Sequence, residues 1–446
     1  MTVSRTICLG FLAVILVGTA LLMLPISTAS GAWNSPVVAL FTSTSAVCVT
    51  GLSVVDVGTF YSFWGQLFIV MLVQVGGLGY MTATTVLLLL LGKRLGLRDK
   101  IAVQQSLDAQ GLSGLAGLLQ SIIATTLVFE LTGAIVLMTV FLPQFRDRPL
   151  WALWQSIFHS VNAFNNAGFS LFSDNLIQYV RNPVMNLTIT GLIIAGGIGY
   201  QVIMELFFWA RDRATRNPKK STFSLNFRTV TRTTLVLLAI GTIAVLATEY
   251  RNPNTLGALD VPHRLMAAWF QAVVPRTAGF NTIDITKMTT AGLFITIALM
   301  FIGASPGSTG GGIKTTTLKV LVDCTRAVLQ GKEVVLSSQR QIPVALILKA
   351  VSVLIGSIAT VISATVLIAV VDPDLDFIQI LFEVVSAFAT VGLTAVGSSN
   401  FSIPGQLLIV LVMYIGRVGI LLLMSAILGD PKPSFVNYPE ENLLVG

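Results

Sequence analysis

Long and short apolar stretches alternate along almost the whole chain. The first, residues 6–25, has roughly the 20 residues that a helix needs to cross a ~30 Å hydrocarbon core. The next, residues 37–47, is about half as long, so it predicts a re-entrant helix that enters the membrane without crossing it. A second long stretch follows at residues 66–91. This pattern predicts a unit made of a span, a short helix, a loop and a second span.

The same order of stretches recurs three more times. First spans are expected at residues 115–141, 233–248 and 344–371, and short helices at 150–164, 264–274 and 377–388. Second spans are expected at residues 184–210, from 291 onward, and at 406–428. The predicted fold class is an all-α membrane protein with four span–pore-helix–span repeats, and thus eight transmembrane helices and four re-entrant loops, around a pseudo-fourfold pore. The predicted repeats are residues 1–92, 93–211, 212–325 and 326–429, followed by a cytoplasmic C-terminal tail at 430–446.

A glycine follows each predicted short helix at a nearly constant period. The four glycines are Gly51, Gly168, Gly279 and Gly392, which lie 111 to 117 positions apart. Each comes ten positions after an aromatic residue, and Leu or Phe follows it directly. A period of this size indicates four copies of one structural unit.

The composition excludes an ordinary soluble domain. Hydrophobic residues make up 54% of the 446 residues and charged residues 11%, with a mean hydropathy of +0.84. A soluble domain carries about 25% charged residues, so this chain cannot cover a water-facing surface. The first stretch lacks a small-residue cleavage motif, so we expect it to remain as a span and not to be removed as a signal peptide. The three cysteines and two histidines show no metal-site spacing.

The net charge of +7 comes from basic loops between the units, which are orientation marks and not a nucleic-acid signal. The basic residues are Lys93, Arg94, Arg98 and Lys100; then Arg211, Arg213, Arg216, Lys219, Lys220, Arg228 and Arg232; then Lys319, Arg326, Lys332 and Arg340. Two crossings per unit return the chain to its starting side. Eight spans with both termini cytoplasmic therefore place every basic loop in the cytoplasm. In the alternative, each short helix is a full span, and the resulting twelve spans put successive basic loops on opposite sides.

The four glycines indicate a cation site built from backbone oxygen. Without a Cβ, a glycine lets the backbone approach a central axis, and inward carbonyls can replace the hydration shell of a monovalent cation. The negative, C-terminal end of each short helix also favours a cation. The preceding residues include no carboxylate: they are Val49, Thr50, Asn166, Ala167, Thr277, Ala278, Thr390 and Val391. The alternative is that each glycine merely ends a helix.

The third of the second spans is interrupted by a segment that cannot continue as helix. Residues 303–314, GASPGSTGGGIK, contain five glycines and a proline. A broken segment at membrane depth is expected to line a cavity. It is a near miss for a nucleotide-binding loop, because Ile313 separates Gly312 from Lys314.

These motifs resemble the Ktr/Trk/HKT potassium transporters, and the resemblance covers residues 6–446. With eight spans the chain looks most like the bacterial Ktr membrane subunits. The resemblance implies a selectivity filter that binds potassium through carbonyls of residues 49–51, 166–168, 277–279 and 390–392. In plant relatives a Ser in the first filter position goes with sodium transport, so Gly51 implies potassium. No tightly bound cofactor is expected, and a dependence on sodium stays open.

The resemblance also implies an intramembrane gate. Its expected residues are Gly303, Ser305, Pro306, Gly307, Ser308, Thr309, Gly310, Gly311, Gly312, Lys314 and Arg417. We hypothesise that Arg417, deep in the last span, pins this loop shut and repels cations. The alternative is that Arg417 extends to the cytoplasmic surface. Many of these relatives carry proline three residues after this arginine, where this chain has Ile420, so the usual cause of a bend in the last helix is missing.

Other charges and the partners are less well specified. Arg276 is expected behind the filter, with Glu383 as its partner, while Glu130 and Glu205 receive no firm role. The sequence has no Walker motif, Rossmann fingerprint or soluble domain, so a nucleotide site would have to come from another chain. The resemblance implies a cytosolic ring of nucleotide-binding regulatory subunits (KtrA-like), and a homodimer of this chain in the bacterial plasma membrane.

Two other classes of function are alternatives to potassium uptake through a channel-like pore. A secondary transporter coupled to sodium or protons would also use broken helices, but usually in two inverted halves. An intramembrane enzyme would need a catalytic set, and no Ser/His/Asp set, His-Glu-x-x-His motif or paired carboxylates occur in any predicted span. We therefore expect no enzymatic activity.

Overall fold

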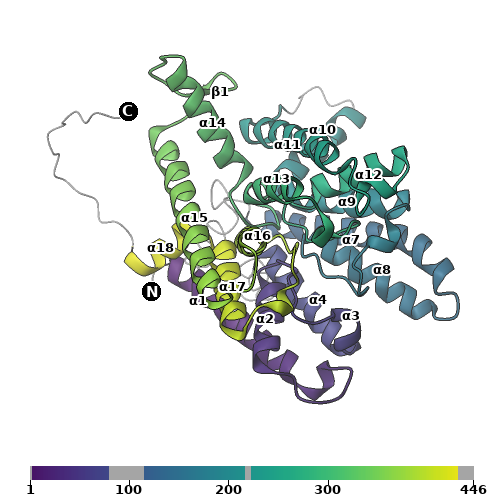
Figure 1. Ribbon diagram of the computed structural model, residues 1–446. Coiled ribbons are helices and arrows are strands. Elements are labelled where there is room, and N and C mark those ends of the chain that lie inside the picture. The colour runs from purple at the N-terminus through teal and green to yellow at the C-terminus, as the bar shows by residue number, and fades with distance from the viewer. Residues whose placement is uncertain (1–2, 80–114, 216–221, 430–446) are drawn as a thin grey trace.

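The computed structural model describes residues 3–79, 115–215 and 222–429, and its regular structure is almost entirely helical (Figure 1). Within these ranges, four single helices are long and apolar enough to cross a membrane. They are α1 (Val3–Met23), α7 (Leu115–Gln144), α11 (Leu225–Glu249) and α15 (Val344–Val371). Each overlaps a predicted first span. Helix α11 begins earlier than predicted, because the Ser224 side chain accepts a hydrogen bond from the Phe227 N–H and caps the helix there.

Four short helices lie where the sequence predicts re-entrant helices. They are α2 (Pro36–Val47), α8 (Pro149–Phe164), α12 (Val261–Val273) and α16 (Phe377–Phe388), with 12 to 16 residues each. These lengths fall short of the roughly 20 residues that a span requires. Proline in the first turn helps to start three of the four, because its fixed φ suits that position and its missing N–H is not needed there. Each short helix packs on the long helix that precedes it.

Two of the four second helices continue after a sharp bend, and a third ends at the irregular segment that the sequence predicts. The four are α4 (Phe63–Leu78), α9 (Pro183–Gly197), α13 (Thr290–Phe301) and α17 (Ile403–Val418). Helix α9 continues as α10 (Tyr200–Ala214) after a bend of 103°, and α17 continues as α18 (Ile420–Leu428) after a bend of 94°. The spans predicted at residues 184–210 and 406–428 are therefore not straight helices: each is a bent pair of helices, which together could form one span. The described residues do not include the part of the first unit's second span after Gly79, the first basic loop or the C-terminal tail.

The bends occur at glycines whose backbone is closed to most other residues. Gly199 has φ +95° and Gly419 has φ +84°. A side chain in this left-handed region costs about 1–2 kcal/mol, whereas glycine pays no such penalty. The last helix is therefore bent at Gly419 although Ile420 stands where the resemblance led us to expect proline.

The helices close into a ring. Each second helix packs against the short helix of the following unit: α4 against α8, α9 against α12, and α13 against α16. The last one, α17, packs against the first short helix, α2. The first and last helices of the described chain, α1 and α18, meet beside this closure, where the Ser4 and Ser425 hydroxyl oxygens are 2.9 Å apart. The short helices and the loops that follow them are thereby held around one centre.

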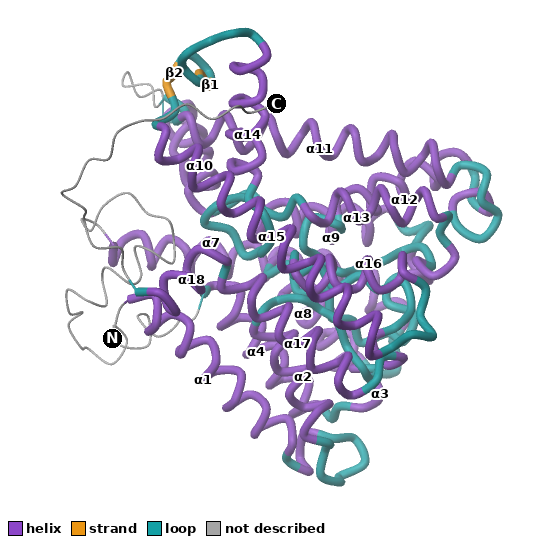
Figure 2. Tube along the Cα trace, turned by 60° about the vertical axis from the view of Figure 1, so that its left-hand side comes forward, coloured by secondary structure: helices purple, strands orange, loops and turns teal. Residues whose placement is uncertain are grey.

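The remaining elements are one further helix, a short hairpin and several one-turn connections. Helix α14 (Thr315–Leu329) and the hairpin of β1 (Leu336–Ser337) and β2 (Arg340–Gln341) lie at one end of the molecule, near α10 (Figure 2). One-turn elements connect the other helices: α3 (Val57–Phe60), η1 (Pro25–Ser27), η2 (Ile177–Tyr179), η3 (Leu256–Ala258), η4 (Ile285–Lys287) and η5 (Ser398–Asn400). The core between them is aromatic, with Phe41, Phe158 and Phe382 of the short helices fully buried.

Candidate functional site

Each short helix ends in a loop with the same backbone conformation. We call residues 49–51, 166–168, 277–279 and 390–392 the glycine loops. In each loop the first residue has a positive φ although it is not glycine: Val49 +58°, Asn166 +60°, Thr277 +73° and Thr390 +52°. The glycine two positions later also has a positive φ: Gly51 +92°, Gly168 +70°, Gly279 +70° and Gly392 +95°. Backbone strain of this kind, shared by four loops, is typical of a functional site.

The glycine loops contact one another in a closed cycle. A Cβ placed on each glycine would meet the carbonyl oxygen of the residue just before the next glycine. The distances are 2.2 Å from Gly51 to Ala167, 2.7 Å from Gly168 to Ala278, 2.6 Å from Gly279 to Val391 and 2.0 Å from Gly392 to Thr50. Any side chain here would displace a carbonyl of the neighbouring loop. The twelve residues predicted as a filter are thus brought together, and their glycines are required by the close approach.

Two serines that the sequence analysis missed support the glycine loops. Ser45 and Ser386 each lie six positions before a glycine, and their hydroxyls accept hydrogen bonds from the N–H groups of Gly51 and Gly392 at 3.0 and 3.1 Å. The other two loops have no serine at this position. The sequence signal that could have identified these residues is a serine six positions before the glycine in two of the four copies.

Glu130 supports the second glycine loop from the neighbouring helices. Its carboxylate accepts a hydrogen bond from the Asn165 amide at 2.9 Å and another from the Gln74 amide at 3.3 Å. The Asn166 amide in turn lies 3.2 Å from the Thr277 hydroxyl, within hydrogen-bond distance in either orientation of the amide. These contacts connect α4, α7 and two of the glycine loops.

A cavity of about 300 Å³ opens on one side of the ring. All four glycines line it, together with the carboxylates Asp56, Asp174 and Asp284. Although partial burial acts to raise the pKa of Asp284, hydrogen bonds from Thr286 and Lys287 outweigh it and hold that pKa below its ordinary value. Carboxylates beside backbone carbonyls make this cavity attractive to cations.

The broken segment, residues 303–314, lies on the opposite side of the ring. Gly310 and Gly311 pack directly against the side chains of Thr277 and Thr390, the first residues of two glycine loops. A Cβ on Gly310 would lie 2.1 Å from the Thr277 hydroxyl, and one on Gly311 would lie 2.4 Å from the Thr390 hydroxyl. The Gly311 N–H donates to that Thr390 oxygen at 3.2 Å. The segment therefore covers the ring of glycine loops on the side opposite the cavity, which we call below.

Backbone hydrogen bonds fasten the broken segment to the bend between α9 and α10. The Ser305 N–H donates to the carbonyl of Gly197 at 3.0 Å, and the Tyr200 N–H donates to the carbonyl of Gly307 at 3.0 Å. Ser305 and Thr309 are fully buried. The segment is thus irregular backbone held inside the protein by hydrogen bonds to the neighbouring bend, the setting in which a membrane protein tolerates such backbone.

Three cationic side chains contact the carbonyls of the broken segment, one of them from the segment itself. Arg417 donates hydrogen bonds to the carbonyls of Thr309 and Gly76, and the Lys314 ammonium donates to the carbonyl of Gly310 at 2.8 Å. The Arg276 guanidinium lies 3.5 Å from the carbonyl oxygen of Gly303. The alternative in which Arg417 extends to the surface is therefore wrong.

The predicted pairing of Arg276 with Glu383 is also wrong. Glu383 accepts a hydrogen bond of 2.5 Å from the Ser398 hydroxyl, while Arg276 faces the start of the broken segment. The side chains diverge because Ser398 belongs to the turn after the fourth glycine loop, whereas Gly303 lies below the ring. Glu205, which received no role, binds the N–H and hydroxyl of Ser224 at the start of α11, with distances of 2.9 and 2.7 Å.

A closed ring of backbone carbonyls, enclosed by membrane-length helices, is the arrangement of a membrane transport protein for cations. The chain belongs to the TrkH family of cation transport proteins, whose family model matches residues 6–437. Membership of this family agrees with the resemblance drawn from the motifs and with the prediction that the chain is not an enzyme.

Relatives of this chain match it over nearly its whole length. It is 39% identical to the "Ktr system potassium uptake protein B" of Bacillus subtilis over 448 residues, covering 100% of this chain and 97% of the relative. It is 38% identical to the protein of the same name in Vibrio alginolyticus, covering 99% and 94% of the two chains. The "Potassium/sodium uptake protein NtpJ" of Enterococcus hirae is 37% identical, with 99% and 97% covered.

A solved structure shares the fold at much lower sequence identity. The crystal structure of the potassium transporter TrkH from Vibrio parahaemolyticus superimposes with a TM-score of 0.70, covering 95% of this chain and 85% of that one. At 18% identity, this likeness supports the fold alone.

Proposed function

We propose that this chain is the membrane subunit of a potassium uptake system and conducts potassium through the ring of glycine loops. The observation that carries the proposal is the closed cycle in which each glycine faces the carbonyl before the next one. Carbonyl oxygens of four loops can replace the water around a large monovalent cation, and no carboxylate in the loops would favour a divalent one. The names of the relatives in Bacillus subtilis and Vibrio alginolyticus, both potassium uptake proteins, support this choice of ion.

In the proposed topology, four repeats contribute eight spans, and both termini lie in the cytoplasm of a bacterial cell. Support comes from the four short helices and from the contact between α1 and α18, the first and last helices of the described chain. The basic loops then all face the cytoplasm. The cavity with Asp56, Asp174 and Asp284 faces outward in this orientation, where its carboxylates raise the local concentration of cations before they reach the filter.

The broken segment is the proposed gate. It lies against Thr277 and Thr390 directly below the filter, and Arg417, Lys314 and Arg276 place positive charge around it. A cation leaving the filter would meet both the backbone of the segment and this charge. Opening then requires the segment to move aside, which means releasing the hydrogen bonds of Arg417 to Thr309 and Gly76.

Regulation is proposed to come from a separate cytosolic chain. The broken segment continues directly into α14, which reaches the end of the molecule that faces the cytoplasm in this topology. A nucleotide-binding ring of KtrA-like subunits on this face, with the membrane chain as a homodimer, fits the word "system" in the names of two relatives. The name of the Enterococcus hirae relative makes sodium a candidate second ion, either transported or required.

Flux measured in liposomes of the purified chain tests the proposal. We expect uptake of potassium with a clear preference over sodium, and Gly51→Ser should reduce that preference because its side chain would displace the Ala167 carbonyl. Gly31→Ser is the matched control, since Gly31 has a similar positive φ of +69° but no atom within 4 Å of its Cβ position. If Gly51→Ser keeps the preference for potassium over sodium, or if the protein transports an organic solute, the chain would instead be a secondary transporter. The glycine loops would then have only a structural role.

A further inference from the structure

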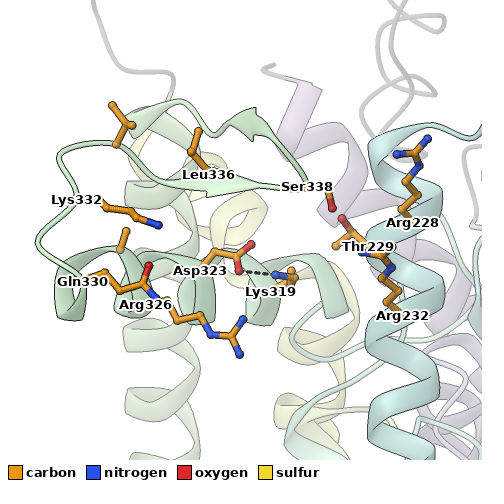
Figure 3. A pocket seen from close by; sticks show the side chains of 12 residues that line it. Arg228, Thr229, Arg232, Lys319, Asp323, Arg326, Gln330, Lys332, Leu336 and Ser338 are labelled. Atoms are coloured by element: carbon orange, nitrogen blue, oxygen red, sulfur yellow. Dashed lines mark hydrogen bonds and ion pairs between the residues drawn. The ribbon is translucent and has the colours of Figure 1, made fainter.

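A second cavity lies outside the ring, at the end of the molecule that carries α14 and the hairpin (Figure 3). It encloses about 340 Å³ and is lined from three directions: the start of α11, one face of α14 and the β1–β2 hairpin. Its charged lining residues are Arg228, Arg232, Lys319, Asp323, Arg326 and Lys332. A volume of this size suits a small ligand or a headgroup.

The charges in this cavity are far from balanced. Five lining side chains are cationic, against the single carboxylate of Asp323, which is already paired with Lys319. Across the described residues, Arg228, Arg232, Arg326 and Lys332 have no carboxylate within 4.0 Å. Cations gathered in a concave site without counter-ions attract an anion.

The arrangement of the arginines favours phosphate over a simple halide. Arg228 and Arg232 lie one turn apart on α11, and Arg326 enters the same space from α14. A guanidinium fork matches two phosphate oxygens, so a single phosphate can bridge arginines from both helices. The Gln330 amide and Ser338 hydroxyl, which also line the cavity, can donate to the remaining oxygens.

The position of the cavity along α11 indicates the source of the phosphate. At about 1.5 Å per residue, Arg228 and Arg232 lie roughly 5 and 10 Å along this membrane-length helix from its start at Leu225. With the span beginning at Leu225, that is the depth of lipid headgroups, on the side that the proposed topology assigns to the cytoplasm. Apolar side chains next to the cavity are strongly exposed: Leu329 by 81% and Leu336 by 48%. Acyl chains would cover such residues.

We propose that this cavity binds a phosphate-bearing anion, supplied by the headgroup of an acidic phospholipid in the inner leaflet. The phosphate bridges Arg228 and Arg232 of α11 to Arg326 of α14, and the acyl chains lie along Leu329 and Leu336. Because α14 begins at Thr315, directly after the broken segment, the lipid would also steady the helix that carries the gate. This consequence and the inner-leaflet source of the phosphate rest on the proposed function and topology, whereas the binding of a phosphate-bearing anion does not.

Native mass spectrometry of the full chain in detergent tests the binding without any flux measurement. The probes are phosphatidylglycerol, phosphatidylcholine and inorganic phosphate, and the variants are Arg232→Gln/Arg326→Gln and, as control, Arg340→Gln. Arg340 is exposed on β2 and does not line the cavity. We expect selective phosphatidylglycerol adducts on the wild type, an affinity loss of roughly fivefold per removed arginine, and no loss in the control.

The remaining outcomes are decisive. Equal phosphatidylglycerol binding by wild type and double variant overturns the proposal, and so does an equal loss in Arg340→Gln. Inorganic phosphate binding that the double variant loses, without selectivity for phosphatidylglycerol, supports the phosphate site and identifies a soluble anion as its source. If the double variant does not fold, Asp323→Asn decides, because it removes the carboxylate that competes with the phosphate and frees Lys319. Tighter phosphatidylglycerol binding supports the site, and unchanged or weaker binding overturns it.

Discussion

The glycine loops and the breaks in the second helices both depend on glycines with a positive φ. The four glycine loops are alike, whereas the breaks differ from one another. The four glycine loops have nearly the same backbone, with a left-handed residue two positions before each left-handed glycine. The breaks are all different: a 103° bend after α9, a 94° bend after α17 and an irregular segment of residues 303–314 after α13.

The contacts of each region explain this difference. Every glycine loop touches the next around a closed cycle, so a change in one copy would disturb its neighbour. The breaks have separate surroundings: a Cβ on Gly199 would meet the carbonyl of Pro306, while one on Gly419 would meet nothing within 4 Å. The glycine loops meet at one centre and must therefore keep the same backbone. The breaks do not contact one another in this way, so their structures and their roles can differ.

The largest effect is expected from Gly279→Ala in the ring. A Cβ there would lie 2.6 Å from the Val391 carbonyl oxygen, and φ is +70°. The left-handed conformation alone costs about 1–2 kcal/mol, and the displaced carbonyl adds to it, so potassium flux should fall roughly tenfold or more. Gly31→Ala has nearly the same φ, +69°, with open space around it, so it isolates the contact from the strain. Equal flux in the two variants would contradict the ring.

Arg417→Ala tests the broken segment as a gate. It removes the donor to the carbonyls of Thr309 and Gly76 together with one of three nearby positive charges. Hydrogen bonds from a charged group contribute about 1.5–3 kcal/mol each, and the loss of even one corresponds to about tenfold, so unregulated potassium flux in liposomes should rise roughly tenfold or more. Arg417→Lys should lie between wild type and Ala, because an ammonium lacks the planar fork that reaches two carbonyls. Flux equal to the wild type in both variants would exclude Arg417 from the gate.

The two bends offer a finer comparison of strain and contact. Gly199→Ala and Gly419→Ala should each lower the free energy of unfolding by about 1–2 kcal/mol, because both residues have a positive φ. Only Gly199→Ala also presses on the Pro306 carbonyl at 2.6 Å, so it alone should change potassium flux, by severalfold. Thermal unfolding and liposome flux measure the two effects separately. If Gly419→Ala changes flux as strongly, the bends themselves control the gate, not the contact with the broken segment.

The sequence predicted what depends on local pattern. The short helices follow from the length of their apolar stretches, and the ring follows from Gly51, Gly168, Gly279 and Gly392 at a steady period. The bends at Gly199 and Gly419 were missed because a glycine inside an apolar helix costs only about 1 kcal/mol and does not reveal a change of direction. The Arg276–Glu383 pair failed because spacing along the chain does not say on which side of a loop each side chain lies.

The smallest effect is expected from Ser386→Ala, which changes no backbone angle. The Ser386 hydroxyl accepts the N–H of Gly392 at 3.1 Å in a fully buried position, so its removal leaves that N–H without its partner. Such a loss costs about 1–3 kcal/mol and should loosen one loop of four, which would lower the preference for potassium over sodium by severalfold. Ser357→Ala in α15 is the matched control, because that buried hydroxyl bonds only the Val353 carbonyl of its own helix. If both variants keep the same preference for potassium over sodium, the contacts between neighbouring glycine loops suffice to hold the ring. The similarity of the four copies would then result from those contacts, and not from the serine hydroxyl of the short helix.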